Sequence, residues 1–176
     1  MIRARVKCAF GVVILGCFVT VVYFTALARA EAPPTPEQVH FAQRTSDLML
    51  ATLFAALLQE FAETTPANVE EGKKSISLIF NDRNEDMRLV GVLHPLRSND
   101  IPQDPFEATA LDHAMQGESF SAVEKVQGSW VYRRSVALSN FHLACAMCHE
   151  NFGPVDASRW VGALILRVPV KDPKTD

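Results

Sequence analysis

The stretch from Cys145 to His149 reads C-A-M-C-H, and its residue types and spacing point to covalent chemistry at a metal centre. Two cysteines three residues apart, followed at once by a histidine, are the attachment signature of c-type haem. The two thiols can form thioethers with the two vinyl groups of one porphyrin, and the adjacent imidazole can ligate the iron. The motif therefore predicts one covalent haem c, with Cys145 and Cys148 as attachment sites and His149 as the proximal iron ligand.

Three other interpretations compete for the same residues. A structural zinc site would need two more soft ligands, and only His142 lies nearby in the sequence. A thiol–disulfide exchange site would place its first cysteine at the start of a helix in a βαβ unit, whereas this motif follows a predicted hairpin. An unreactive cysteine pair is the third alternative. Haem is favoured because the spacing includes the histidine and because the chain carries an export signal.

The second axial position of the iron decides between an electron carrier and a ligand-binding protein. His94 is one candidate for the distal ligand, since it closes an apolar predicted strand directly before Pro95. Met49 is another, on a predicted helix among leucines, and an open site is a further alternative. Each candidate also has a structural reading, because His94 can be a hydrogen-bonded core histidine and Met49 can fill the core. The other candidates are His40, Met87, His113, Met115, His142 and Met147.

The N-terminal segment has the features of an export signal. Three basic residues precede an apolar run over residues 9–28, and the Ala-Arg-Ala sequence at 28–30 is typical of a cleavage site. The run is also long enough to span a bilayer. Residues 1–30 are therefore either a cleaved signal peptide or an N-terminal membrane anchor, and a lipoprotein-type signal ending at Cys17 is a weaker alternative. In each case residues 31–176 are exported, to the periplasm or its equivalent.

The exported part is acidic. The leader holds four basic residues and no acid, which leaves 13 basic and 20 acidic residues and a net charge of −7. No basic stripe is present to neutralise phosphates, so nucleic acid is not expected as a partner. The charge suits a soluble exported domain and a basic partner. The haem reading implies a redox partner protein. Only two cysteines remain after the leader, so the core must form by packing rather than through disulfides.

The predicted elements indicate an α+β domain. Residues 31–36 form a proline-rich linker, and Thr35-Pro-Glu-Gln starts a long amphipathic helix that runs to about Glu63. Residues 68–82 read as a second helix, or as a strand in their last half. The remaining patterns predict a strand over residues 88–94, a short helix over 104–115 and a hairpin over 120–138. The C-A-M-C-H loop follows the hairpin, and a last strand covers residues 160–170. Hairpins outnumber crossovers, so we expect an antiparallel sheet with flanking helices.

Four stretches of the chain carry a resemblance. They are LMLATLFAALLQEF at 48–61, LHPLRSNDIPQDPFE at 93–107, GSWVYRRSVALSNFHLACAMCHENFG at 128–153 and VGALILRVPV at 161–170. Together they resemble a family of single-haem c-type proteins with a PAS-like fold, which includes a cyanobacterial haem protein. The resemblance implies a haem-binding PAS-like domain over residues 37–176, with the haem packed against a central sheet. It assigns Cys145, Cys148 and His149 the roles given above.

One departure from this family concerns the distal ligand. In the cyanobacterial member that ligand is a cysteine, expected in the segment ANVEEGKKS at 67–75, which holds no thiol. Histidine–cysteine ligation is therefore not carried over. We expect a non-catalytic electron carrier, and the alternative is a haem-based redox or gas sensor that signals through a partner. A peroxidase-like enzyme would need polar distal groups, for which Arg97, His94 or Arg133 are candidates, but the sequence gives no positive sign of it.

Overall fold

A computed structural model describes residues 32–82, 85–93 and 98–171. The chain divides into two compact units, Met1–Pro33 and Pro34–Asp176, and the described residues lie almost entirely in the second. Among the described helices, none combines the length and the apolar character needed to cross a membrane. The predicted leader lies outside the described residues. The elements in chain order are α2 (Pro36–Glu60), α3 (Pro66–Asp82), β1 (Met87–Gly91), η1 (Ser98–Asp100), α4 (Pro105–Ala114), β2 (Phe120–Val126), β3 (Ser129–Asn140), α5 (Leu143–Cys148), η2 (Glu150–Phe152) and β4 (Asp156–Pro169).

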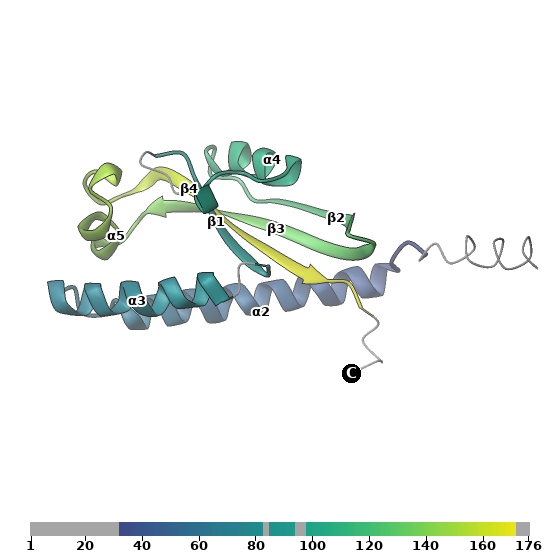
Figure 1. Cartoon of the computed structure of the whole chain (residues 1–176), viewed down its shortest axis with the longest axis horizontal. Helices are drawn as coiled ribbons and strands as arrows, with labels where there is room; N and C mark the ends of the chain where they lie inside the picture. The colour runs from purple at the N-terminus through teal and green to yellow at the C-terminus, as the bar shows by residue number, and fades with distance from the viewer. Residues whose placement is uncertain (1–31, 83–84, 94–97, 172–176) are drawn as a thin grey trace, which may run out of the picture. The chain divides into compact units, whose positions relative to one another are not determined.

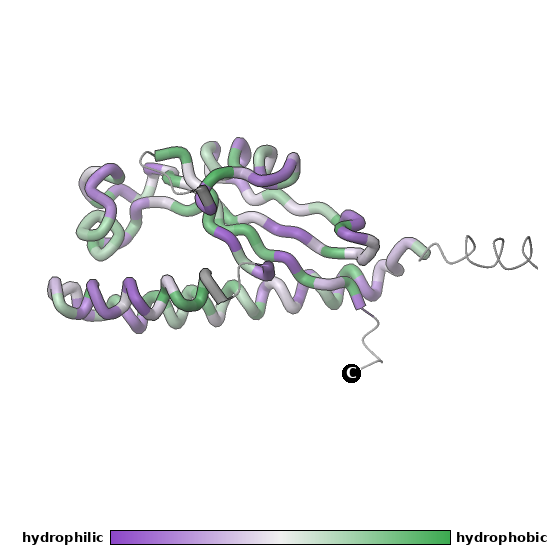
Figure 2. The backbone as a smooth tube through the Cα atoms, viewed as in Figure 1, coloured by the Kyte–Doolittle hydropathy of each residue, from purple (hydrophilic) through white to green (hydrophobic). Residues whose placement is uncertain are grey.

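The four described strands form one antiparallel sheet in the order β1-β4-β3-β2. β4 pairs with β1 on one side and with β3 on the other, so that Ala163 lies between Val90 and Ala137. Strands that are buried on both faces read as continuous hydrophobic runs, and residues 161–166 are all buried. Figure 2 shows the hydrophobic stretches along this strand. The α+β class and the antiparallel sheet predicted from the sequence are confirmed.

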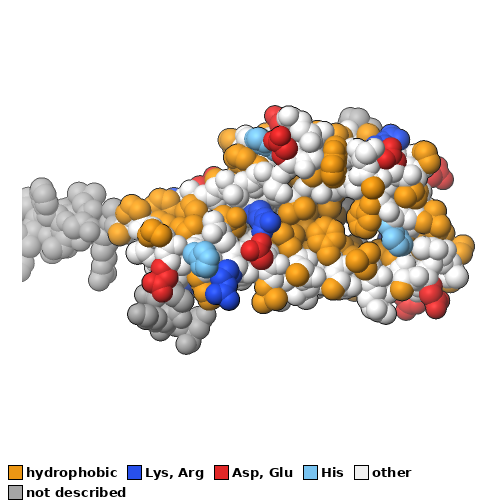
Figure 3. Space-filling view, turned by 180° about the vertical axis from the view of Figure 1, so that it is seen from behind, with side chains coloured by type: hydrophobic (Ala, Val, Ile, Leu, Met, Phe, Trp, Pro, Cys, Tyr) orange, Lys and Arg blue, Asp and Glu red, His pale blue; other side chains and the backbone are white. Residues whose placement is uncertain are grey.

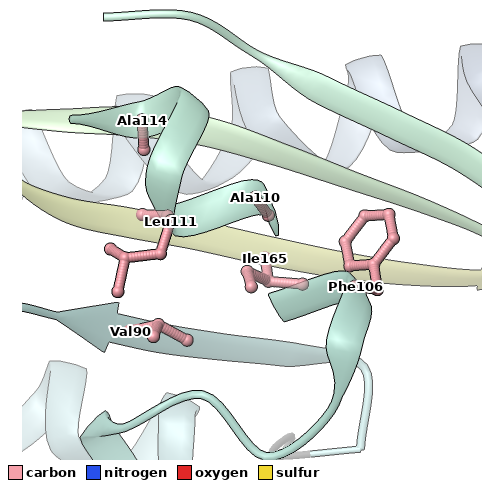
Figure 4. Close-up of a cluster of buried hydrophobic side chains, with 7 residues drawn as sticks. Val90, Phe106, Ala110, Leu111, Ala114 and Ile165 are labelled. Atoms are coloured by element: carbon pink, nitrogen blue, oxygen red, sulfur yellow. The ribbon is translucent and has the colours of Figure 1, made fainter. Parts of the chain in front are cut away.

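α4 covers one face of the sheet (Figure 1). Its Phe106 ring packs in a cluster of buried side chains that includes Ile165 of β4 (Figure 4). Asp104 caps the helix by accepting a hydrogen bond from the Glu107 backbone nitrogen at 2.9 Å, and Pro105 occupies the first helical position. The predicted start of this helix is confirmed, because both signals are local in the sequence.

α2 covers the opposite face. Its Leu50 and Leu53 pack against Leu164 of β4, whose side chain points away from α4 because neighbouring residues of a strand face opposite sides. The predicted capping box is confirmed. The Thr35 side chain accepts from the Gln38 backbone nitrogen at 3.3 Å, and the Gln38 side chain accepts from the Thr35 backbone nitrogen at 2.8 Å.

α3 shows that the ambiguous segment 68–82 is helical. It starts at Pro66, and the Thr65 side chain accepts a hydrogen bond from the Asn68 backbone nitrogen at 3.3 Å. α2 ends at Glu60, before the predicted end near residue 63. Gly72 of α3 lies against the Phe61 ring so closely that an added Cβ would come within 2.7 Å of a ring carbon. Glycine therefore permits the close approach of α3 to the end of α2.

β2 and β3 form the predicted hairpin. Gln127 and Gly128 both have positive φ, at 50° and 91°, as a two-residue type I′ turn requires. β3 extends further than predicted, to Asn140, and β4 starts earlier, at Asp156. The reason is that these two residues still pair with each other beyond an irregularity in the register. The C-A-M-C-H segment leaves the sheet at this end.

Candidate functional site

C-A-M-C-H is predicted to lie in a loop, but residues Leu143–Cys148 form the short helix α5. His142 explains the difference, because it is the N-cap and its Nδ1 accepts a hydrogen bond from the Ala144 backbone nitrogen at 3.2 Å. Histidine is not among the usual N-cap residues, so the sequence carries no ordinary start signal here. The helix ends at His149, whose backbone nitrogen donates to the Cys145 carbonyl at 2.8 Å.

The two cysteines differ in their surroundings. They are three residues apart in a helix, so both lie on the same side of α5. Both are free thiols; Cys148 is exposed and Cys145 is partly buried. Burial raises the pKa of the Cys145 thiol above its ordinary value. The two cysteines form no disulfide in the structure and lie on one side of the helix, as thioether formation with a single porphyrin requires.

His149 stands next to these thiols. It is exposed, and its imidazole stacks on the Phe152 ring of η2, with the ring centroids 4.4 Å apart and the ring planes 11° apart. This stacking restricts the orientation of the imidazole. The structure thus brings Cys145, Cys148 and His149 together at one end of the sheet.

Asn140, which the sequence-based reasoning missed, holds the chain that follows the motif. Its side chain is fully buried, and the amide nitrogen donates to the backbone carbonyls of Phe152, Gly153 and Pro154, at 3.4, 3.1 and 2.8 Å. These bonds close the segment from the end of β3 to the start of β4 into a fixed loop. No local pattern in the sequence points to this role, since the partners lie twelve to fourteen residues away.

Asn151 ties the same loop to the end of the β1 segment. Its side-chain nitrogen donates to the Leu93 carbonyl at 3.2 Å. Leu93 directly precedes His94, the first candidate for the distal iron ligand, in the sequence. The described chain is therefore hydrogen-bonded to the loop one residue before that candidate. His94 itself lies outside the described residues.

Met49, the second distal candidate, lies elsewhere. Its side chain packs against buried residues of two core clusters between α2 and the sheet. The end of α2 does approach the motif, because the Phe61 ring centroid lies 6.4 Å from that of His142. Met49 precedes Phe61 by twelve residues, which is about 18 Å along a helix. The structure therefore does not bring Met49 and His149 together.

Arg133, a candidate for a polar distal group, is held under α4 and is only 3% exposed. Its guanidinium lies 2.9 Å from Asp104 and 3.5 Å from the buried Glu107 carboxylate. Arg88 and Arg167 reach the same Glu107 oxygen at 3.1 and 2.7 Å, the former as an ion pair without hydrogen-bond geometry. This cluster joins α4 to β1, β3 and β4, so Arg133 serves the fold.

Several apolar residues within or close to the motif in the sequence are exposed. They are Phe141, Leu143, Met147 and Val155, at 39–50%. On the face drawn in Figure 3, hydrophobic side chains are exposed over much of the surface and are densest near its middle. Two cysteines without a disulfide, an exposed imidazole and exposed apolar side chains close in the sequence suit a covalently held porphyrin, whose faces are apolar.

Among the described residues, no three His, Cys, Asp or Glu side chains are grouped as a protein-only metal site requires. A haem does not need such a group, because the porphyrin supplies the in-plane ligands of its iron. No protein-family model matches the chain, and no curated protein matches it in sequence.

Proposed function

We propose that the protein is an exported c-type cytochrome with a single haem and a PAS-like fold, which exchanges electrons with a redox partner protein. The observation that carries the proposal is the placement of Cys145 and Cys148 on one short helix with His149 as its C-cap, together with the exposed apolar side chains close by in the sequence. The predicted leader supports it, because c-type haem is attached outside the cytoplasm. The leader, if retained, would anchor the protein to the inner membrane through residues 9–28. The antiparallel sheet with helices on both faces supports the PAS-like part.

Each motif residue would have a distinct role. Cys145 and Cys148 would hold the haem through two thioethers, each formed by adding one S–H bond across one vinyl group with no leaving group. His149 would ligate the iron through its imidazole, and the stacked Phe152 ring would limit how that imidazole turns. When bound, the haem supplies a one-electron iron couple. Asn140 and its hydrogen bonds keep the loop after His149 in place.

The first experiment tests covalent attachment. The full chain, leader included, is expressed in a host that matures c-type cytochromes, and the exported protein is examined by mass spectrometry and pyridine haemochrome spectrum. We expect one haem per chain that resists acid–acetone extraction. Cys145→Ser and Cys148→Ser should each give a spectrum with one unreacted vinyl group, and the double variant should lose its haem on extraction. Met147→Leu, inside the motif but without a role, is the matched control. Wild-type protein without haem, or with zinc in its place, would refute the proposal.

The second experiment tests electron transfer against sensing. A carrier should show six-coordinate, low-spin iron in both oxidation states, whereas a gas sensor should bind carbon monoxide in the ferrous state. Absorption and magnetic circular dichroism spectra of His94→Ala test the distal ligand that the sequence suggests. Met49→Leu is the control and should leave the ligand-field bands unchanged, because Met49 lies in the core. Ready carbon monoxide binding by the wild-type protein would favour the sensor.

A further inference from the structure

The large exposed hydrophobic residues of α2 lie along one line on its solvent side. Phe41, Leu48 and Leu58 are 44, 69 and 52% exposed. Ala51 and Ala55 fill the line between the leucines, and both are exposed as well. With the one polar member included, we call this line the α2 seam: Phe41, Arg44, Leu48, Ala51, Ala55 and Leu58.

The seam has the spacing of a helix-pairing surface. Its members follow one another at alternating steps of three and four residues, which is the heptad pattern of knobs-into-holes packing. The residues of α2 that face the sheet are a different set, namely Ala42, Ser46, Leu50 and Leu53. The apolar character of the seam is therefore not required by the fold of one chain, and no other described part of the chain covers it.

We propose that two copies of this protein associate through the α2 seam as an antiparallel pair of helices. An antiparallel second copy places the seam in register with itself. Phe41 then meets Leu58 of the second copy, and Leu48 meets Ala51 of the second copy. Arg44 meets Ala55 of the second copy, whose small side chain leaves space for the arginine stem to reach solvent. In a parallel pair each Arg44 would face the Arg44 of the other copy, and like charges in contact oppose association.

The size of the seam predicts a reversible dimer. From Phe41 to Leu58 the helix is about 26 Å long at 1.5 Å per residue. The six seam residues and their flanks are fewer than the roughly 20–30 residues that a standard interface uses on each side. We therefore expect the dimer population to rise with protein concentration. This proposal does not depend on the haem, since α2 carries no residue of the C-A-M-C-H motif.

The test is sedimentation velocity of the purified exported protein over a wide range of concentrations. The wild type should shift from monomer towards dimer as its concentration rises. Leu48→Glu should raise the dissociation constant by about tenfold or more, because the symmetric pair receives two buried charges from one substitution. Leu78→Glu is the matched control, since Leu78 is 61% exposed on α3 and lies outside the seam. Circular dichroism of each variant checks that the fold is intact.

Cysteine cross-linking tests the orientation, with the protein without an added cysteine as the baseline. Two copies of Ala51→Cys lie close together in the antiparallel pair and should cross-link, whereas two copies of Phe41→Cys lie at opposite ends and should not. Cross-linking at position 41 would overturn the antiparallel arrangement. A wild type that stays monomeric at every concentration would overturn the dimer, and so would an equal effect of Leu78→Glu. Binding of that monomer to lipid vesicles would instead identify the seam as a membrane-contacting surface.

Discussion

Replacing Asn140 by aspartate exchanges an amide donor for a carboxylate at a point where three backbone carbonyls converge. The amide nitrogen now donates to the carbonyls of Phe152, Gly153 and Pro154, and the side chain is 0% exposed. An ionised aspartate would face these oxygens without a donor or solvent. The folded protein should therefore keep this carboxyl protonated, which means that its folded-state pKa is raised.

The free energy of this change can be worked out from linkage. An unfolded aspartate has a pKa of about 3.9. Keeping the carboxyl protonated in the folded state lowers the free energy of unfolding by about 1.4 kcal/mol for each unit by which the pH exceeds that value, or roughly 4 kcal/mol at pH 7. A carboxylic acid also donates one hydrogen bond where the amide donates two, at about 1 kcal/mol. Asn140→Asp should thus lower the free energy of unfolding by about 5 kcal/mol at pH 7 and by about half as much at pH 5. The raised pKa has this sign because the folded state binds a proton that the unfolded state has released.

Urea unfolding at pH 5, 6 and 7 measures the effect, with wild type and Asn140→Ala beside the aspartate variant. The difference between Asn140→Asp and wild type should widen by about 1.4 kcal/mol per pH unit. Asn140→Ala should cost about 1–3 kcal/mol for the unsatisfied carbonyls, with no change over this pH range. A difference for the aspartate variant that stays constant with pH would refute the reasoning.

Three further predictions concern the ion cluster and the motif. Glu107→Gln should lower the free energy of unfolding by about 3–5 kcal/mol, because it leaves buried arginines without their shared carboxylate. Glu124→Gln, at the exposed edge of the cluster, should lower it by about 1 kcal/mol or less, and urea titrations of both variants measure the difference. Burial opposes the ionisation of Asp104, but hydrogen bonds from an arginine side chain and the helix backbone hold its pKa below the ordinary value. Asp104→Asn keeps the helix cap and should cost about 1 kcal/mol at pH 7, a difference from wild type that should vanish as the pH falls below the ordinary carboxyl range. In the haem-free protein iodoacetamide should modify Cys148 before Cys145, because burial shields Cys145 and raises its pKa. Peptide mass spectrometry would show the order of modification, and equal rates would contradict the described burial.

Elements with local signals could be predicted from the sequence. Thr35 and Asp104 both precede a proline, and each caps the helix that the sequence predicts there. Gln127-Gly128 marks the hairpin, and the continuous apolar run of β4 marks a strand buried on both faces. The three motif residues are also predictable as a set, because neighbours within five residues of a chain remain neighbours in space.

Features that depend on distant partners could not be predicted. The close approach of Gly72 of α3 to the Phe61 ring, at the end of α2, joins residues that no local pattern pairs. α5 depends on an unusual histidine cap, and the roles of Asn140 and Asn151 depend on carbonyls far along the chain. The residue type and the apolar neighbours of Met49 suit both an iron ligand and a core residue, so only its distance from the motif distinguishes the two.

The three clusters of buried side chains contain no residue from Cys145 to His149. Under the proposed function, substitution of Cys145 or Cys148 would remove no side chain from these clusters. A loss of haem attachment in such variants should therefore be separable from a loss of the buried core, which urea unfolding would report.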